Sequence, residues 1–402
     1  MINGSETSVN RRRERSEKER GEYWGDILKN QKKSNDTIRI AFQNINGFIN
    51  SKNEIKTEHI KDFIHDNEIE IMTMAEMNTN WNKLPKNRSL HQTIRGWCEH
   101  QHIIAAFNQR DKYGAMHQPG GTAVFCRDEM GLRFMGAGVD EKKLGRWSWM
   151  KFRGKNSMSI RVISVYVPNI TLQTGSKKVY NQQKHALLAM GISQSVSTVF
   201  WSDFWKLIDE VLDNGENIIV AGDWNTDVRD ERFLNPFSQR NLVPAVIDRH
   251  GRNGPETFGG GTNPIDEIFV SAGIQINRSG YLAHGDSIGD HRPIWVEIDK
   301  SSALGAKLPP LHFYNARRLK TQDPKVVEKY NTLLEKYLKK HGAYERIADL
   351  YASFSIPLSL GQQTEFEKLD KIRERGMIIA EKNCRKLKMG AIQWSPKFTR
   401  LR

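Results

Sequence analysis

Two polar side chains close an apolar segment near the middle of the chain. Residues 217–221 have the β-branched, apolar composition of a buried strand, and Gly222-Asp223-Trp224-Asn225 follows them directly. Residues two apart on a strand project to the same side, so we expect Asp223 and Asn225 to face one cleft. A carboxylate and an amide there can orient a water molecule and hold a phosphoryl oxygen. Asp and Asn also favour turns that end strands, so the tetrapeptide alone fits either interpretation.

Further polar residues occupy comparable positions, at or beside other apolar, strand-like runs. Each is of a type that can bind a metal ion, contact a phosphate or transfer a proton. These residues are Asn44 and Asn46, Glu76, Tyr166 and Asn169, Asp266, and the neighbours Asp290 and His291. Because so many polar residues lie at or beside strand-like runs, we favour a single catalytic site over a series of unrelated turns.

The elements that must position these residues alternate between strands and amphipathic helices. Helices are predicted at residues 55–65 and 201–212, where apolar residues recur at helical spacing. Strands are predicted at residues 38–42, 69–74, 121–126, 147–153, 159–167, 217–221, 265–271 and 294–298. Strands outnumber helices and interleave with them, which indicates a layered α/β domain over residues 37–300, with helices outside packed sheets.

The segments on either side of this domain differ in composition. Residues 1–36 hold a run of Arg, Lys and Glu without apolar periodicity, so we expect a basic, mobile arm there. Residues 301–322 begin with small residues and prolines, which predicts a linker. Residues 323–402 are predicted to form a basic helical tail with two long helices. The first, at 323–342, opens on an Asp-Pro pair, and the second, at 364–390, opens on a capping-box spacing.

The distribution of charge indicates the kind of partner. The chain has 402 residues and a formal net charge of +14. Residues 303–402 carry twenty-one Lys and Arg against ten Asp and Glu, a net of +11. A basic region of this size predicts a polyanionic partner, and we favour nucleic acid over a membrane.

Composition excludes several classes of protein. No apolar run approaches the roughly 18 to 20 residues that a membrane span needs, and the N-terminus lacks the apolar core of a secretory signal. The three cysteines, Cys98, Cys126 and Cys384, have no CxxC spacing, so neither a disulfide framework nor a thiolate zinc site is expected. We therefore expect an intracellular protein, and the arginine-rich arm is compatible with a nuclear one.

In their order along the chain, these motifs resemble the endonuclease/exonuclease/phosphatase family of metal-dependent phosphodiesterases and phosphomonoesterases. The resemblance covers residues 37–298. Its motifs contain, in order, Asn44 and Asn46, Glu76, Tyr166 and Asn169, Asp223 and Asn225, Asp266, and Asp290 and His291. It implies a four-layer α/β sandwich in which two packed sheets are flanked by helices, followed here by the α-helical basic tail.

The resemblance implies a site for a divalent cation. Glu76 would be the principal ligand, assisted by Asn44 or Asn46 and by Asp290. Carboxylate and amide oxygens of this kind suit Mg²⁺ or Mn²⁺. The cation would help to stabilise the negative charge that develops on the phosphate during attack.

The same resemblance assigns the chemistry of that attack. Asp223 would orient and deprotonate the attacking water, while Asn225 would hold the scissile phosphate. His291 would contact a non-bridging oxygen in the tautomer that Asp266 selects. The phosphate site would be further lined by Tyr166 and Asn169.

Within the family, the chain is most similar to endonucleases of retroelements. Apurinic/apyrimidinic repair enzymes carry Asp at the position of Asn46, whereas Asn-x-Asn-Gly resembles the retroelement branch. The tail is similar to the connector between endonuclease and reverse transcriptase in some non-LTR retrotransposons, whose parent element would supply the polymerase downstream. The leading hypothesis is a Mg²⁺-dependent endonuclease that nicks DNA. The alternatives are a phosphodiesterase or phosphatase of small or lipid phosphate esters, and an inactive nucleic-acid-binding relic.

Overall fold

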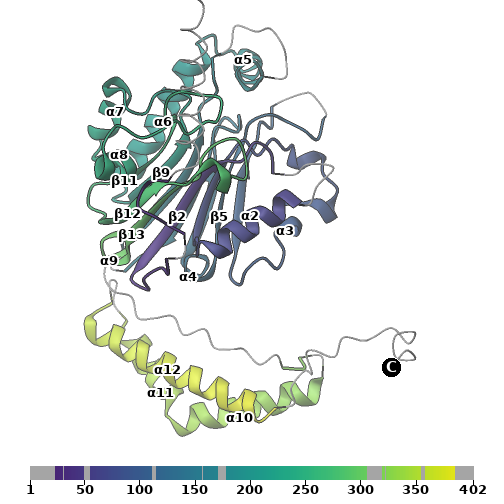
Figure 1. Ribbon diagram of the computed structural model, residues 1–402. Coiled ribbons are helices and arrows are strands. Elements are labelled where there is room, and N and C mark those ends of the chain that lie inside the picture. Colours follow the sequence, from purple (N-terminus) through teal and green to yellow (C-terminus); the bar gives the residue numbers. More distant parts are fainter. Residues whose placement is uncertain are drawn as a thin grey trace, which may run out of the picture. The chain divides into compact units, whose positions relative to one another are not determined.

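Two mixed β-sheets lie at the centre of the first of two structural units. The computed structural model describes residues 23–29, 31–48, 55–110, 115–155, 157–170, 178–305, 319–321, 323–354 and 358–384. The chain divides into Met1–Pro310, which holds both sheets, and Leu311–Arg402, whose described part is helical (Figure 1). Among the described helices, none is both long enough and apolar enough to cross a membrane.

The larger sheet has seven strands over the described residues. Their spatial order is β1 (Trp24–Gly25), β12 (Ile276–Tyr281), β13 (Ile294–Asp299), β2 (Thr37–Asn44), β3 (Ile71–Ala75), β5 (Thr122–Cys126) and β4 (His102–Ala106). Neighbouring strands are antiparallel except β2 and β3, which are parallel. The connection between this parallel pair contains helix α2 (Ile55–Asp66).

The second sheet has six strands. Their spatial order is β10 (Leu242–Pro244), β11 (Asp266–Ser271), β9 (Asn217–Asp223), β8 (Ser159–Tyr166), β7 (Trp147–Arg153) and β6 (Phe134–Val139). Only β8 and β9 are parallel, and the crossover between them contains α5 (Val179–Ala189) and α6 (Val196–Asp213). Each sheet therefore has one parallel pair near its centre.

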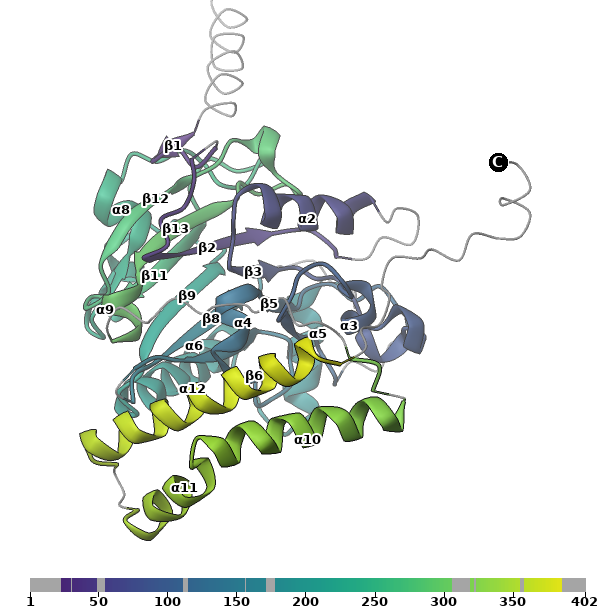
Figure 2. The ribbon, with the colours of Figure 1, turned by 90° about the horizontal axis from the view of Figure 1, so that it is seen from below.

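The sheets pack face to face, and helices cover their outer faces (Figure 2). Alternate residues of β2, such as Ile40 and Phe42, enter the core between the sheets, where they join Ile219 of β9. Helix α2 covers the outer face of the larger sheet, and α6 with α7 (Glu231–Ser238) covers that of the smaller one. The shorter helices are α3 (Leu90–Thr93), α4 (Asp128–Leu132), α8 (Ala245–His250), α9 (Lys300–Leu304), η1 (Trp81–Lys83), η2 (Lys86–Arg88) and η3 (His284–Asp286). The four-layer sandwich expected from the sequence is confirmed.

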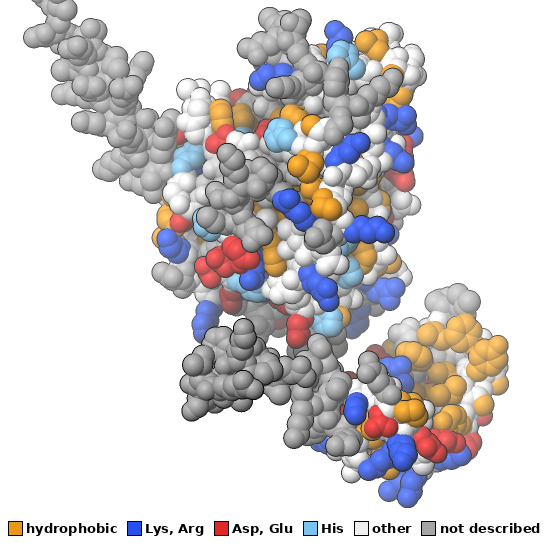
Figure 3. All heavy atoms as spheres, turned by 90° about the vertical axis from the view of Figure 1, so that its right-hand side faces the viewer, with side chains coloured by type: hydrophobic (Ala, Val, Ile, Leu, Met, Phe, Trp, Pro, Cys, Tyr) orange, Lys and Arg blue, Asp and Glu red, His pale blue; other side chains and the backbone are white. Residues whose placement is uncertain are grey.

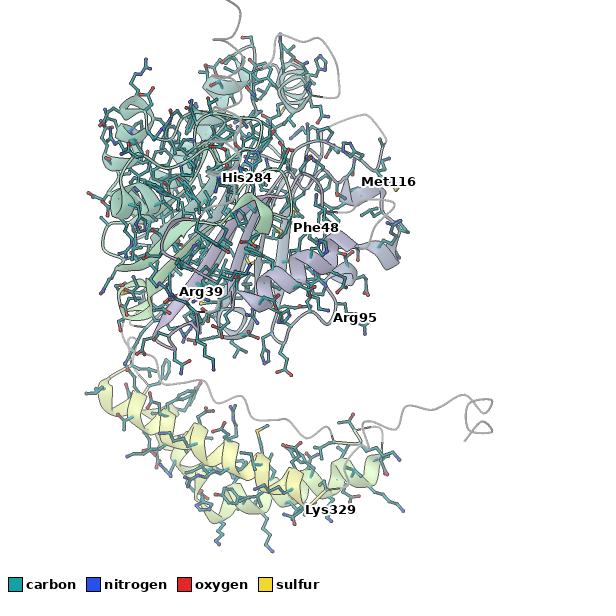
Figure 4. All side chains as sticks on the ribbon, in the orientation of Figure 1. Arg39, Phe48, Arg95, Met116, His284 and Lys329 are labelled. Atoms are coloured by element: carbon teal, nitrogen blue, oxygen red, sulfur yellow. The ribbon has the colours of Figure 1, made fainter. Side chains whose placement is uncertain are left out.

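A buried ion pair fixes β2 against β13. Arg39, labelled in Figure 4, lies directly opposite Glu297 in the antiparallel register. Its side chain is only 1% exposed and donates to Glu297 Oε2 from Nε at 3.1 Å and from Nη2 at 2.8 Å. Nη1 donates to the backbone oxygen of Asn67 at 2.7 Å. Because a buried guanidinium needs such partners, this pairing helps to define the register of the two strands.

The first unit begins earlier than the sequence predicted. Residues 1–36 were expected to form an arm, but Trp24–Gly25 pairs with β12 and Leu28 is 1% exposed in the core. This part of the prediction is wrong because a two-residue strand carries no periodicity and forms only against the edge of an existing sheet. The remainder of the expected arm, up to residue 22, lies outside the described residues.

Two other boundaries also differ. Helix α6 starts at Val196, five residues before the predicted 201, because Ser195 Oγ accepts a hydrogen bond from the backbone N–H of Thr198 and caps the helix. The strand predicted at residues 69–74 is β3, Ile71–Ala75, because Ile69 and Glu70 are still in the connection from α2. The two-residue shift of β3 is of the size usual for the ends of elements, whereas the shift of α6 is larger.

The described part of the second unit has three helices rather than two. They are α10 (Pro324–Lys340), α11 (Ala343–Ala352) and α12 (Leu360–Lys382). Asp323 caps α10 as predicted, and Gly342, with φ of 59°, turns the chain into α11. The prediction for 364–390 is wrong at both ends. Ser359 and Gln362 form the capping box of α12, and Asn383 is its C-cap.

The helices of the second unit leave apolar side chains exposed. Gly376 lets α12 approach α10 closely, since a Cβ at this position would lie 2.9 Å from Tyr337. By contrast, Tyr351 of α11 is 81% exposed and Phe366 of α12 is 59% exposed. Figure 3 shows hydrophobic side chains gathered on this unit.

Candidate active site

The polar residues expected at strand ends meet at one edge of the two sheets. In the parallel pairs, Asn44 of β2 lies opposite Ala75 of β3, and Tyr166 of β8 lies opposite Asp223 of β9. The carboxyl ends of parallel neighbours lie at the same edge of a sheet, which brings these residues together. Asn44 Nδ2 donates to Asp223 Oδ2 at 2.8 Å, and this buried hydrogen bond joins the two sheets. The site is therefore built from both sheets.

Asp223, Asp266 and His291 form a buried cluster at this edge. The antiparallel register of β9 and β11 places Asp223 directly opposite Asp266. His291, three residues before β13, has Nδ1 at 2.8 Å from Asp266 Oδ2 and Nε2 at 3.9 Å from Asp223 Oδ2. Asp266 Oδ1 has no hydrogen-bond partner among the described residues. The expected contact between Asp266 and His291 is thus present, and it holds the imidazole with Nε2 turned towards Asp223.

Burial and mutual charge alter the proton affinities within this cluster. Burial, together with the charge of Asp266, raises the pKa of Asp223 to about 8. Burial opposes the charged form of His291, but the adjacent Asp266 carboxylate outweighs it and raises the pKa of His291 to about 10. At neutral pH, His291 is therefore an imidazolium held by Asp266. A pKa of about 8 makes Asp223 a stronger base than an ordinary carboxylate, and its ionised, proton-accepting form predominates only above that pH.

A second group of contacts surrounds Asn46 in the loop after β2. Its backbone N–H donates to Asn44 Oδ1 at 3.0 Å, and its Nδ2 donates to Asp290 Oδ2 at 3.3 Å. Asn78 Nδ2 donates to Asn46 Oδ1 at 3.3 Å. Asn46 has a positive φ of 45°, a conformation that Asn tolerates better than most residues. These contacts bring Asn44, Asn46 and Asp290 together, as expected.

Glu76 and Tyr166 lie between these two groups. Glu76 follows β3 directly, is half-buried and has a φ of 50°. The Tyr166 hydroxyl hydrogen bonds with the side chains of Glu76 and Asn225, and burial, with the charges of Glu76 and Asp223, raises its pKa well above the usual value. Tyr166 therefore stays a neutral phenol that can donate a hydrogen bond at this edge.

Asn225 is held in a fixed orientation at the end of β9. Its backbone N–H donates to Asp223 Oδ1 at 3.1 Å, and its Nδ2 donates to the backbone oxygen of Val167 at 2.6 Å. An amide nitrogen carries two hydrogens, and the second one is shared with the Tyr166 hydroxyl, so a ligand oxygen would bind Asn225 in place of that contact. Asn169, whose side chain is exposed, lines the same pocket as Asn225. The structure thus places Asn225 beside Asp223, and Asn169 in the same pocket as Asn225.

The donor set near Glu76 fits a hard divalent cation. It comprises the carboxylates of Glu76 and Asp290 and the amide oxygens of Asn44 and Asn46, all of which are hard oxygen donors. Both carboxylates act electrostatically on Lys56, so their charges share one neighbourhood. Ligand atoms of Asp223, Asp266 and His291 also lie within 4.8 Å of one another. A cation in that cluster would have to displace the proton of His291, so we favour the side of Glu76.

The sequence analysis missed two residues of the site. Lys56, in the first turn of α2, donates from Nζ to the backbone oxygen of Asn46 at 2.9 Å. Burial lowers its pKa, while Asp290 and Glu76 oppose that change. Asn78 donates to Asn46 and accepts from the backbone N–H of Gly120 at 2.7 Å. Asn78 could have been found from its two-residue spacing to Glu76, but Lys56 reaches the site from a helix and has no such signal.

Comparison with known proteins agrees with this arrangement. The family model described as "Endonuclease/Exonuclease/phosphatase family" matches residues 41–291. No curated protein sequence matches the chain. Similar solved structures include the human nocturnin catalytic domain with bound sulfate anion, with 14% identity, a TM-score of 0.46, and coverage of 70% of this chain and 97% of that one.

Two further solved structures have a similar extent of overlap. An AP endonuclease from Archaeoglobus fulgidus has 14% identity and a TM-score of 0.44, covering 64% of this chain and 98% of that one. The mannosyl-6-phosphatase Bt3783 of Bacteroides thetaiotaomicron has 15% identity and a TM-score of 0.42, covering 65% of this chain and 99% of that one. Because the family model spans more than half of the 402 residues, the chain belongs to the endonuclease/exonuclease/phosphatase family, whose members hydrolyse phosphate esters and typically use a divalent metal ion.

Proposed function

We propose that this protein is a divalent-metal-dependent phosphodiester hydrolase that nicks DNA, from the retrotransposon branch of its family. The observation that carries the proposal is the environment of Asp223. Its carboxylate is buried, is held by Asn44 across the two sheets and lies beside the His291 imidazolium. With a pKa of about 8, the ionised form of Asp223 is basic enough to take a proton from an attacking water.

The side chains around Asp223 have complementary roles in this proposal. As the water attacks phosphorus, its proton passes to Asp223, and the bond to the leaving oxygen breaks. Asn225 holds a phosphoryl oxygen with the N–H that otherwise contacts Tyr166, and the positive charge of His291 offsets the charge that develops there. Tyr166, a neutral phenol, can turn its single hydroxyl hydrogen from Glu76 to the leaving oxygen.

The proposed cation is Mg²⁺ or Mn²⁺, held by Glu76 and Asp290 with the amide oxygens of Asn44 and Asn46. When bound, it supplies positive charge that polarises the phosphate. The Lys56 ammonium lies in the same neighbourhood and adds to that field. Glu76 also accepts a hydrogen bond from the Tyr166 hydroxyl, which orients the Glu76 carboxylate. Through this hydrogen bond the cation site is in contact with the phosphate site.

DNA is favoured as the substrate by the charge of the C-terminal region and by the resemblance at Asn46. Of the net +11 on residues 303–402, the described residues between 319 and 384 hold only +2, with twelve Lys and Arg against ten Asp and Glu. The other nine positive charges are in residues 306–318 and 385–402, which contain no Asp or Glu. We propose that these two segments supply the sequence-independent attraction to the phosphate backbone of DNA.

Plasmid nicking tests the catalytic proposal. Purified protein should convert supercoiled plasmid to the open circle with Mg²⁺ or Mn²⁺, leave 3′-hydroxyl ends, and lose this activity in EDTA. Asp223→Asn should lower the rate by about 10² or more while retaining most DNA affinity, because it removes the proton acceptor but no phosphate contact. Nicking that continues in chelator would contradict the mechanism. Hydrolysis of a phosphoinositide without nicking would instead support the small-substrate alternative.

The salt dependence of binding tests the DNA contact separately. Residues 385–402 carry six Lys and Arg and no acidic residue, so a chain ending at Cys384 loses up to six phosphate contacts. Each contact contributes about 0.9 to the slope of log affinity against log salt, so the slope should become shallower by as much as about 5. Lys339→Gln is a control, because Lys339 already pairs with Glu335. Equal slopes for the full and shortened chains would remove the proposed DNA-anchoring role of these residues.

A further inference from the structure

An aromatic pocket opens directly beside the candidate phosphate site. It has a volume of about 470 Å³, and Trp201, Trp205 and Phe233 form much of its wall. Asn169 and Asn225, the two residues proposed to hold the phosphate, line its other side. A volume of this size is typical of a site for a small molecule or for one group of a larger substrate.

The aromatic wall is not needed to complete the hydrophobic core. Helix α6 buries Phe200 and Phe204 fully against the smaller sheet, whereas Trp201 and Trp205, one turn apart, are only half-buried. Both rings therefore keep surface available to the pocket. Trp224 is 1% exposed and supports the wall from behind, with its ring 6.2 Å from Trp201 and almost parallel to it at 10°.

The rings of the wall pack closely on one another. The rings of Trp201 and Trp205 are stacked with centroids 5.5 Å apart and an interplanar angle of 20°, and the Arg240 guanidinium lies 4.5 Å over the Trp205 ring. Phe233 meets Trp201 edge to face at 6.2 Å and 70°. A planar π-system can make offset or edge contacts with the exposed parts of these rings, whereas an alkyl chain gains only area burial. The wall therefore favours a flat aromatic group over a lipid tail.

Polar residues also line the pocket. Asp230 and Arg232 pair with each other at 2.9 Å, and the Arg232 side chain is 91% exposed. The hydroxyl-bearing residues Ser197 and Thr226 contribute to the lining as well. A flat group with hydrogen-bonding edges, such as a nucleobase, matches a lining that combines aromatic and polar side chains.

The pocket is connected to the catalytic residues through Asn225. The backbone N–H of Asn225 donates to Asp223 Oδ1, and its side chain is anchored to Val167, another residue of the pocket. A group attached to a phosphate at Asn225 therefore lies at the mouth of the pocket.

We propose that this pocket binds the base of a nucleotide adjacent to the scissile phosphate, stacked against Trp201 and Trp205. The inference rests on the proposed nuclease function. It adds a subsite for one base, and that base must leave the helical stack to enter the pocket. Base stacking on aromatic side chains tolerates any sequence, so the pocket supports cleavage without strict base specificity. Moving the base out of the stack requires less free energy when the base at this position is unpaired or weakly paired.

Base-free substrates test the proposal through cleavage. Oligonucleotides with a single cleavable site carry a tetrahydrofuran residue on one side or the other of the scissile phosphate. One of the two should be cleaved with kcat/KM lowered by about 5- to 100-fold, as expected for the loss of one stacked base. In Trp201→Leu, which keeps apolar volume but lacks the ring, the intact and base-free substrates should differ by less than about 2-fold. Trp149→Leu is the control, because Trp149 is half-buried, packs on Arg161 and lies outside the pocket.

Direct binding distinguishes failure of the pocket from failure of the nuclease function. Deoxyadenosine monophosphate should quench the tryptophan fluorescence of the full chain at concentrations where deoxyribose 5-phosphate does not. Trp205→Leu should weaken this nucleotide binding, and the Trp149 control should not. If nothing is cleaved but quenching follows this pattern, the nuclease proposal is wrong and the base pocket stands. If nucleotide and sugar phosphate behave alike, or if Trp201→Leu slows both oligonucleotides equally, the pocket proposal is overturned.

Discussion

Replacing Asp266 by Asn tests whether His291 acts as a cation. Asp266 Oδ2 accepts from His291 Nδ1, and its Oδ1 has no hydrogen-bond partner among the described residues. An Asn side chain can keep an oxygen toward His291 and place its amide where Oδ1 was. The change therefore removes a charge while it preserves the contact and the orientation of the ring.

The size of the effect follows from the causes of the pKa shift at His291. Burial lowers this pKa, and the carboxylate of Asp266 makes the largest contribution in the other direction, which brings it to about 10. Without that carboxylate, the remaining charges of Asp223 and Asp290 oppose burial less effectively, so the pKa of His291 should fall well below 10. Asp266 also raises the pKa of Asp223, so Asp223 should stay ionised to lower pH in the variant. The rate at pH 7.5 should fall about tenfold for each unit by which the pKa of His291 drops below that pH, with partial recovery as the pH is lowered toward 6.

The measurement combines a pH profile with direct titration. Nicking rates at saturating Mg²⁺ are recorded from pH 5.5 to 9, and the His291 ring is titrated by NMR in metal-free protein. Asp227→Asn is a matched control that removes one carboxylate outside the site, where Asp227 pairs with Arg229. An Asp266→Asn rate that is low at all pH values, with an unchanged His291 pKa, would contradict the charge argument. A rate equal to that of the parent would exclude any role for the pair.

Three further predictions concern the cation, the core and the second unit. Glu76→Gln should raise the Mg²⁺ concentration for half-maximal nicking by about tenfold or more, without changing the salt slope of DNA binding. Arg39→Met leaves the Glu297 carboxylate buried and unpaired, so urea unfolding should show a loss of about 3 to 5 kcal/mol, partly recovered by adding Glu297→Gln. Ser359→Ala removes the capping box of α12, and hydrogen exchange in its first turn should accelerate by a factor that corresponds to about 1 kcal/mol.

The catalytic edge could be predicted because its residues follow strands whose pattern is clear in the sequence. Parallel strands have their carboxyl ends at one edge, so Asn44 and Glu76 had to be neighbours once β2 and β3 were paired. The contact between Asp223 and Asn44 could not be derived in this way, because it crosses from one sheet to the other. Residues of both sheets could be assigned to one site only because the order of their motifs resembles that of a known family.

The features that were missed depend on tertiary contacts. Lys56 was correctly placed on a helix, but nothing in residues 55–65 shows which backbone oxygen its side chain reaches. Trp201 and Trp205 pack against the core and also border the pocket, because Phe200 and Phe204 already fill the core side of α6. Helical spacing identifies residues on a similar face, but it does not say whether space remains beyond them.

Because the site has one half on each sheet, its geometry depends on the core between them. Asp223 and Asp266 belong to the smaller sheet, whereas Asn44 and His291 belong to the strands or loops of the larger one. Well-packed interiors transmit small displacements, and a carboxylate 3.9 Å from an imidazole nitrogen is sensitive to shifts of a few tenths of an ångström. Conservative changes between the sheets should therefore reduce catalysis before they reduce stability, whereas changes of the same size under α2 should affect stability first.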